Sequence, residues 1–314
     1  MIITLQDTET REISAKIDEL HEERGESATG RVLTHGQVHD SARRLAEASP
    51  VFLAVRGSYH GRTAGSLAVT ANAAYGVMYQ GRSAVEARFL PRDPGEADVE
   101  RALSECRLEG LVPPPSSSSS SPSSAPSSSS SASPFCSFSR VAACFVEWIQ
   151  GEGGMRPMPG RSARALSRAL RRERVPLVAD EIQTGLFRTG TFLASEHYND
   201  RREREDPTIV PDYVLLGKSL GGGIAKLAAV CIGSACYEPE FGRLHSSTFA
   251  DDDLSCAIGL EVLDELCGAG PRTSPCPRSE ELRARSEGFE QAVRACVERI
   301  QRRHPGVVRE VRGR

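Results

Sequence analysis

The chain has 314 residues, of which 39% are hydrophobic and 26% charged, and its net charge is −3. This composition suits a protein with a folded core and excludes a chain that is disordered throughout. The slightly acidic balance argues against a nucleic-acid partner. No apolar run reaches the ~18 residues that a membrane helix needs. Charged residues are spread through the first twenty positions, where a secretory signal would have an apolar segment. We therefore expect a cytoplasmic protein with no membrane partner.

Two residue types are used unusually. The nine cysteines form no C-x-x-C pair, so their spacing predicts neither a zinc site nor a disulfide framework, but reduced, buried thiols. Of the 39 basic residues only Lys16, Lys218 and Lys226 are lysines. Arginine can supply surface charge but cannot condense with an aldehyde, so each remaining lysine is a candidate for covalent chemistry.

Short apolar runs alternate with stretches of helical periodicity along the chain. Near-continuous apolar runs of strand length are typical of strands buried on both faces, and strand–helix alternation predicts an α/β domain with a mostly parallel sheet. In chain order we expect a strand at 51–55, a helix around 101–110, a strand at 141–147, a helix at 162–173, strands at 177–180, 213–216 and 228–232, and helices at 254–266 and 280–303.

A serine-rich segment interrupts this pattern at residues 113–134. Fourteen of the 18 residues from Ser116 to Ser133 are serine, and such a tract has nothing to bury that would offset its ordering entropy. A helical stretch precedes it and an apolar strand follows it. We therefore predict a disordered surface insertion in a loop between a helix and a strand.

Three predicted strands end in polar, glycine-rich sequences. They run into EWIQGEGG (147–154), DEIQTGLFRTG (180–190) and GKSLGGG (217–223). Ligands of parallel sheets bind beyond the carboxyl ends of the strands, so a carboxylate and a lysine meet at one edge. Pyridoxal phosphate needs a lysine for its aldehyde, an acid for its ring nitrogen and donors for its phosphate. Lys218 and Asp180 fit the first two requirements.

These motifs, together with YHGRT (59–63), PDYVLLGKSLGGG (211–223) and HSSTF (245–249), resemble the class III aminotransferases, which include ornithine, acetylornithine and 4-aminobutyrate aminotransferases. The resemblance runs from about residue 38 to the end. It implies a fold-type-I pyridoxal-phosphate transferase: an N-terminal remnant at 1–30, a large cofactor-binding domain at 31–267 interrupted by the insertion, and at 268–314 a connecting helix with the start of a small domain that is otherwise missing.

The resemblance also implies roles for individual residues. Lys218 and Asp180 would be catalytic, Lys218 as the lysine that forms an aldimine with the coenzyme and Asp180 as the partner of the ring nitrogen. Tyr59, which would stack on the ring, His60 from the same motif and Gln183 near the ring hydroxyl would bind the cofactor. Three further residues would contact the ligands. Thr248 would reach the coenzyme phosphate of the neighbouring subunit in a homodimer. Arg62 would bind a substrate carboxylate, and Glu152 would lie near the substrate.

The chain departs from the family at several positions. The phosphate-binding loop is represented only by THGQV (34–38), and ADDD (250–253) replaces a glycine-rich sequence; we expect these aspartates to cap the following helix. Trp148 replaces a proline, and the arginine expected to pair with Glu152 would lie beyond residue 314.

Three functions follow. The first is transfer of an amino group from an amine or amino acid to a 2-oxo acid such as 2-oxoglutarate. The second is a catalytically impaired remnant or partial gene model, and the third a same-fold aminomutase or racemase.

Overall fold

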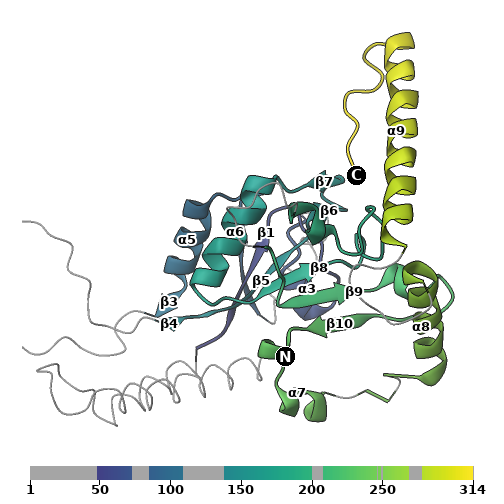
Figure 1. Cartoon of the computed structure of the whole chain (residues 1–314). Helices are drawn as coiled ribbons and strands as arrows, with labels where there is room; N and C mark the ends of the chain where they lie inside the picture. Colours follow the sequence, from purple (N-terminus) through teal and green to yellow (C-terminus); the bar gives the residue numbers. More distant parts are fainter. Residues whose placement is uncertain are drawn as a thin grey trace, which may run out of the picture.

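The computed structural model describes residues 48–72, 85–108, 138–199, 208–245, 247–248, 250–268 and 278–313, which form a layered α/β fold around one six-stranded sheet (Figure 1). The strand order is β10-β9-β8-β5-β1-β2, and every neighbouring pair is parallel except β9 and β10. The strands are β1 (Val51–Val55), β2 (Glu86–Leu90), β5 (Val141–Val146), β8 (Leu177–Asp180), β9 (Tyr213–Leu216) and β10 (Ala229–Ile232).

The sequence predicted five of these strands, and their positions are confirmed to within one residue. The prediction that all five are buried on both faces is wrong for β10, an antiparallel strand at the edge of the sheet in which Val230 is 57% exposed. It holds only in part for β9, in which Leu216 is buried and the other three residues are partly buried. The sequence analysis missed β2, because EARFL mixes charged and apolar residues, as suits an edge strand that is only partly covered.

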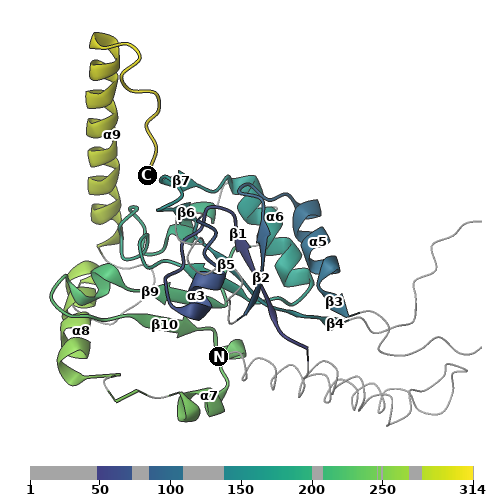
Figure 2. The same ribbon diagram turned by 180° about the vertical axis from the view of Figure 1, so that it is seen from behind.

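Helices cover the sheet on both faces because alternate residues of its central strands point in opposite directions. Val51, Leu53 and Val55 of β1 pack with α5 (Glu96–Glu105) and α6 (Gly160–Arg172), which lie side by side. The intervening Phe52 and Ala54 pack on the opposite face, near α3 (Ala64–Ala68) (Figure 2).

The predicted apolar face of α6 is confirmed: Ala163, Leu166 and Leu170 are at most 1% exposed. Each buried leucine contributes about 1.5–3 kcal/mol relative to an exposed one. The helix expected around 101–110 is α5, which begins and ends earlier in the chain.

Trp148 is fully buried and its ring lies 5.3 Å from that of Tyr198, whose hydroxyl donates to the Met158 carbonyl at 2.8 Å. Trp148 therefore lies in the same core cluster as Ala163 and Leu166 of α6. The remaining short elements are β6 (Ile149–Gln150) and β7 (Arg156–Pro157), which form a hairpin, η1 (Ala194–Tyr198), η2 (Lys218–Gly221), η3 (Ser234–Cys236) and α7 (Pro239–Leu244).

The two C-terminal helices differ in how they meet the sheet. Asp252 caps α8 (Asp253–Cys267) by accepting a hydrogen bond from the Ser255 N–H at 2.8 Å, as predicted; this bond lowers the pKa of Asp252. By contrast, α9 (Ser279–Arg303) extends away from the sheet (Figure 1).

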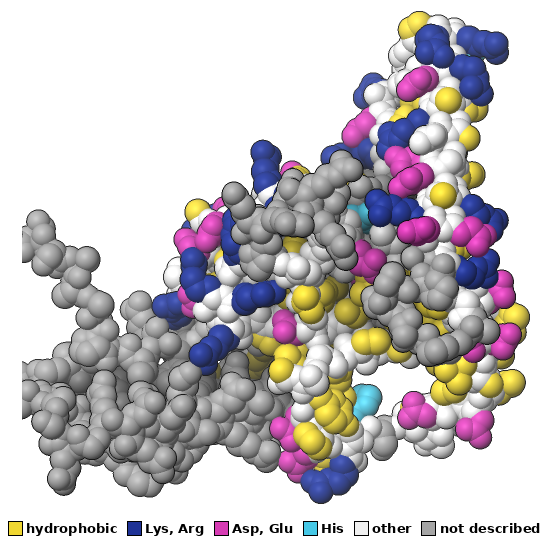
Figure 3. All heavy atoms as spheres, in the orientation of Figure 1, with side chains coloured by type: hydrophobic (Ala, Val, Ile, Leu, Met, Phe, Trp, Pro, Cys, Tyr) yellow, Lys and Arg dark blue, Asp and Glu magenta, His cyan; other side chains and the backbone are white. Residues whose placement is uncertain are grey.

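The apolar stripe predicted for α9 is therefore not part of the core within the described residues. Phe289 is 73% exposed and Val293 and Ile300 are each 40% exposed, and apolar and charged side chains alternate along this helix in Figure 3. None of the helices in the described residues is both long and apolar enough to span a membrane.

The seven described cysteines are free thiols, but only Cys106 and Cys144 are buried, so the expectation of buried cysteines is wrong for the others. Burial raises the pKa of the Cys144 thiol to about 12.

The serine-rich segment lies outside the described residues, but its flanks are well defined. Strand β3 (Arg107–Leu108) pairs antiparallel with β4 (Phe138–Ser139), with Leu108 opposite Phe138. The chain therefore leaves the domain and returns to it at one point, which supports a proposal that this segment is an insertion.

Deleting residues 116–133 should change stability little. The deletion shortens the 29 residues between β3 and β4 to 11. Since closure entropy depends only logarithmically on loop length, we expect the free energy of unfolding to rise by less than about 1 kcal/mol. Urea unfolding of the deletion variant and its parent measures this, and a clear loss of stability or of folded protein would contradict the insertion.

Candidate functional site

Polar side chains follow four neighbouring strands where each strand ends. Tyr59 and His60 follow β1, Glu147 follows β5, Asp180 is the last residue of β8, and Lys218 follows β9. Because these four strands are parallel and adjacent, their carboxyl ends lie at one edge of the sheet. The topology thus brings together residues separated by up to 159 positions (59 to 218).

Asp180 is buried, at 6% exposure. The His60 Nδ1–H donates to Asp180 Oδ2 at 2.8 Å, and the Ile182 N–H donates to Oδ1 at 3.2 Å. No lysine or arginine pairs with this carboxylate among the described residues. Its oxygens still have lone pairs that can accept from a further N–H donor. Such a donor would stabilise the carboxylate, because the side chain is largely shielded from water.

The surroundings of His60 indicate which ring nitrogen holds its proton. Its side chain is 1% exposed, its ring lies 5.6 Å from that of Phe145, and Nε2 has no hydrogen-bond partner within the described residues. A proton on Nδ1 satisfies Asp180 and leaves only a weak acceptor unpaired, whereas a proton on Nε2 would leave a buried donor unpaired. His60 is thereby fitted to orient Asp180.

Glu147 fixes the loop that carries Tyr59 and His60. Its Oε2 accepts from the Tyr59 N–H at 2.8 Å and its Oε1 from the Gly151 N–H at 3.2 Å. Burial raises the pKa of Glu147, an effect that the nearby Asp180 reinforces and the two backbone donors oppose. The sequence analysis gave Glu147 no role, although a carboxylate directly after a buried strand was the available signal.

Glu181 is a second buried carboxylate that the sequence analysis missed, at 1% exposure. It accepts hydrogen bonds from the Thr184 hydroxyl and from the Ala194 and Ser195 N–H groups, so it ties the turns after β8 to η1. Burial raises its pKa, the three donors opposing the shift. Glu181 therefore holds the loop that begins at Asp180.

Lys218 lies in a turn whose backbone is strained. Its φ is 42°, in the left-handed region where a side chain costs about 1–3 kcal/mol, and Gly222 and Gly223 continue the turn at φ 61° and 76°. Leu220, which is 4% exposed, anchors the turn in an apolar cluster with Leu216 and Leu263 of α8. The packing of α8 on this turn therefore holds the backbone of Lys218 in its strained conformation.

Gln183 links the lysine to the β5 segment. The Lys218 ammonium donates to Gln183 Oε1, and a Cβ at Gly151 would stand only 2.6 Å from Gln183 Nε2. A side chain at position 151 would therefore displace Gln183. The structure brings Asp180 and His60 together, and Gln183 and Lys218 together, along the same edge.

The other predicted site residues lie farther out. Arg62 is exposed just before α3, and Thr248 is exposed just before α8. Glu152 is exposed and has no hydrogen bond or ion pair within the part of the chain that the structure describes. The candidate phosphate loop at 34–38 lies outside the described residues.

These residues fit pyridoxal phosphate at two of its functional groups. An exposed lysine is available to its aldehyde. A buried carboxylate without a cationic lysine or arginine partner in the described part of the chain is available to its ring N–H. A ring N–H of the cofactor would add a further donor to this buried charge and so offset part of the cost of burying it.

Comparison with known proteins identifies the family. The model of the class-III aminotransferase family matches residues 32–314, so the chain belongs to this family. Among solved structures, the ornithine aminotransferase of Toxoplasma gondii is 26% identical, with a TM-score of 0.60, over 89% of this chain and 53% of that chain; that protein holds pyridoxal phosphate at partial occupancy in its active site.

Two further structures support the fold alone. The N-acetylornithine aminotransferase of Stenotrophomonas maltophilia is 23% identical, with a TM-score of 0.52, over 89% of this chain and 53% of that one. An aminotransferase of Bacillus anthracis is 18% identical, with a TM-score of 0.62, over 88% and 55%. The chain thus spans about half the length of the solved structures it matches.

Glu147→Gln should change the pH dependence of stability. Since folding raises the pKa of Glu147, its contribution to the free energy of unfolding is greatest below the usual glutamate pKa and falls as pH rises through the folded value. The amide of the variant would leave one of the two backbone donors facing an NH₂ group, so the variant should be less stable by about 1–3 kcal/mol.

The difference between parent and variant should therefore shrink as pH rises from about 5 to about 8. Urea unfolding at both pH values measures it, with Glu298→Gln at an exposed position of α9 as the matched control. A difference that grows with pH would contradict the assigned direction.

Proposed function

We propose that the protein is a pyridoxal-phosphate-dependent aminotransferase. The observation that carries the proposal is the pairing of the buried Asp180 with His60 at the same sheet edge as the strained Lys218. Carboxylates are rarely buried, and a left-handed backbone at a lysine is strained, so both features favour a functional role over a structural one. Membership in the class-III family supports the same activity.

The residues divide the work by position. When bound, pyridoxal phosphate supplies an aldehyde that receives the amino group and a protonated ring that accepts electrons. Lys218 would hold the aldehyde of the cofactor and would be placed to carry a proton to and from the substrate. Asp180 would hold the proton on the ring nitrogen, with His60 orienting Asp180 and Gln183 positioning Lys218.

The substrate side of the proposal rests on exposed residues. Arg62 would bind a substrate carboxylate through its guanidinium fork, and Tyr59 would stack on the ring. We propose an amine or amino acid as donor and a 2-oxo acid, such as 2-oxoglutarate, as acceptor, with Glu152 on the donor side. Product analysis with an added 2-oxo acid separates amino transfer from racemisation or amino migration.

The proposal includes a homodimer in which Thr248 reaches the coenzyme phosphate of the other subunit. Thr248 is exposed, and the nearby helix α8 presents Leu254 at 72% and Leu260 at 51% exposure, an apolar surface that a second copy would cover. Light scattering of the purified chain, which distinguishes one copy from two, tests this part of the proposal.

Asp180→Asn should leave the coenzyme attached but lower the turnover number by roughly 100-fold or more, because an amide cannot hold the ring proton while Lys218 is untouched. Single-turnover kinetics and absorbance of the bound coenzyme measure the two effects. Asp212→Asn, which alters a carboxylate that accepts from the Leu177 N–H at the opposite edge of the sheet, is the matched control. Equal activity of the Asp180 variant and its parent would remove Asp180 from this role.

Lys218→Arg should abolish covalent attachment of the coenzyme, since a guanidinium stays protonated and does not condense with an aldehyde. Borohydride reduction followed by peptide mapping should place the coenzyme mass on the peptide that contains Lys218. Lys226→Arg is the control and should be tolerated. Label on Lys226 or Lys16, or on no peptide at saturating coenzyme, would contradict the proposal and favour an impaired remnant.

A further inference from the structure

A cavity of about 300 Å³ lies between the β6–β7 hairpin, the loop that follows β2, and residues 310–313; we call it the hairpin cavity. Its volume is at the lower end of the range of small-molecule sites. Its lining includes Arg92 and Asp93 of the loop and Gln150 and Arg156 of the hairpin. The C-terminal residues close another side of the cavity, and the end of the chain lies beside β7 in both Figure 1 and Figure 2.

Two side chains of the hairpin have buried polar atoms without partners. Gln150 and Arg156 lie opposite each other in the β6–β7 pair, so their side chains share one face of the hairpin. Gln150 is 3% exposed, and its Nε2 donates to the Arg56 carbonyl at 2.9 Å, which identifies Oε1 as the acceptor. This Oε1 and the Arg156 Nε–H form no hydrogen bond within the described residues. Since buried polar groups are normally paired, both atoms indicate a partner that the described part of the chain does not supply.

The loop after β2 adds one unpaired charge of each sign. Neither Arg92 nor Asp93 forms a hydrogen bond or an ion pair with any residue that the structure describes. The Arg92 guanidinium lies against Gly57, where a Cβ would stand 2.6 Å from Arg92 Nη2 and 2.8 Å from Gln150 Oε1. The absence of a side chain at Gly57 therefore lets the guanidinium and the unpaired amide oxygen approach the same point.

The other charged residues that line the hairpin cavity already have partners. Arg312 Nε pairs with Glu310 at 2.7 Å, and Arg294 Nε pairs with Glu290 at 2.8 Å. Both oxygens of Glu147 accept hydrogen bonds from backbone N–H groups. The groups that remain for a ligand are therefore two guanidiniums, one carboxylate and one amide oxygen.

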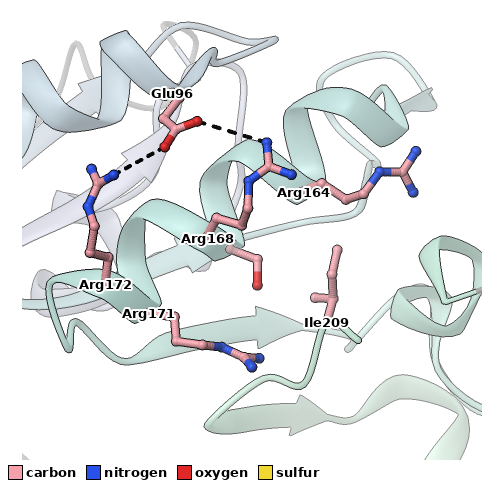
Figure 4. Close-up of a pocket in the computed structure, with 7 residues that line it drawn as sticks. Glu96, Arg164, Arg168, Arg171, Arg172 and Ile209 are labelled. Carbon is pink, nitrogen blue, oxygen red and sulfur yellow. Dashed lines mark hydrogen bonds and ion pairs between the residues drawn. The ribbon is translucent and has the colours of Figure 1, made fainter. Parts of the chain in front are cut away.

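A second cavity, of about 360 Å³ beside α6, differs in that its charged groups are engaged. Figure 4 shows Glu96 between Arg168 and Arg172, with an ion pair to each. Arg171 donates to the Thr208 carbonyl at 3.1 Å. Unpaired groups of both signs thus distinguish the hairpin cavity from the cavity beside α6.

The hairpin cavity lies beside the candidate active site without including its reactive residues. It lies near the carboxyl ends of β2 and β5, whereas Asp180 ends β8 and Lys218 follows β9, on the other side of β5. Neither of these two residues lines the cavity. A ligand in the hairpin cavity would therefore leave both of them available to the cofactor.

We infer that the hairpin cavity binds a small zwitterion of the α-amino acid class, as a site additional to the substrate site proposed around Arg62. The ligand carboxylate accepts from the guanidiniums of Arg92 and Arg156, which bind carboxylates through paired N–H groups. The ligand ammonium donates to Asp93 and to Gln150 Oε1. Asp93 would repel a dianion and the two arginines would repel a diamine, so the lining favours a ligand that carries both charges.

Equilibrium dialysis of the full chain against radiolabelled L-alanine, without added coenzyme so that no amino group is transferred, tests this site. Propionate and ethylamine are the matched competitors, because each is L-alanine without one of its two charged groups. L-Alanine should bind at least about tenfold more tightly than either competitor, since each competitor loses a charge-assisted contact.

Two exposed residues distinguish the two ends of the ligand. Arg92→Gln should weaken the binding of both L-alanine and propionate about tenfold, whereas Asp93→Asn should weaken the binding of L-alanine alone. Arg161→Gln is the matched control, because it removes an exposed guanidinium of α6 outside the cavity, and it should bind L-alanine like the parent. Thermal unfolding of each variant separates a lost contact from a lost fold, and it should match the parent because these side chains are exposed.

The inference is overturned if L-alanine does not bind at millimolar concentration, or if propionate or ethylamine competes as well as L-alanine does. It is equally overturned if Arg92→Gln and Asp93→Asn bind L-alanine like the parent. Loss of binding in Arg62→Gln but not in Arg92→Gln would place the amino acid at the proposed substrate site and overturn the inference as well.

Discussion

The buried carboxylate of Asp180 is the constraint on which the candidate site depends. Taking a charge out of water costs several kcal/mol unless donors surround it, and here the described donors are His60 and the Ile182 N–H. Keeping His60 in place requires its loop to be fixed, and the Glu147 carboxylate does this through the Tyr59 N–H. Asp180 and Glu147, both buried, therefore order the loops from two neighbouring strand ends.

A second constraint, backbone strain, fixes the position of Lys218 at the same edge of the sheet. A left-handed lysine persists only where the surrounding packing outweighs its cost, and the cluster of Leu216, Leu220 and Leu263 supplies that packing. The ends of β8 and its neighbouring strands therefore position the buried carboxylates, and packing against α8 positions the lysine. Changes in α8 remote from the cofactor would then act through the position of Lys218.

The sequence by itself determined the central strands, the buried face of α6 and the strand ends that carry Lys218 and Asp180, because continuous apolar runs and glycine-rich strand ends are local signals. The choice of Gln183 came from the resemblance to the class III family. It did not determine the antiparallel edge position of β10, the exposure of the α9 stripe or the role of Glu147. These depend on which neighbour covers a residue, and a periodic pattern shows that a face is apolar without showing what packs on it. Only the tertiary structure placed His60 against Asp180, 120 residues away.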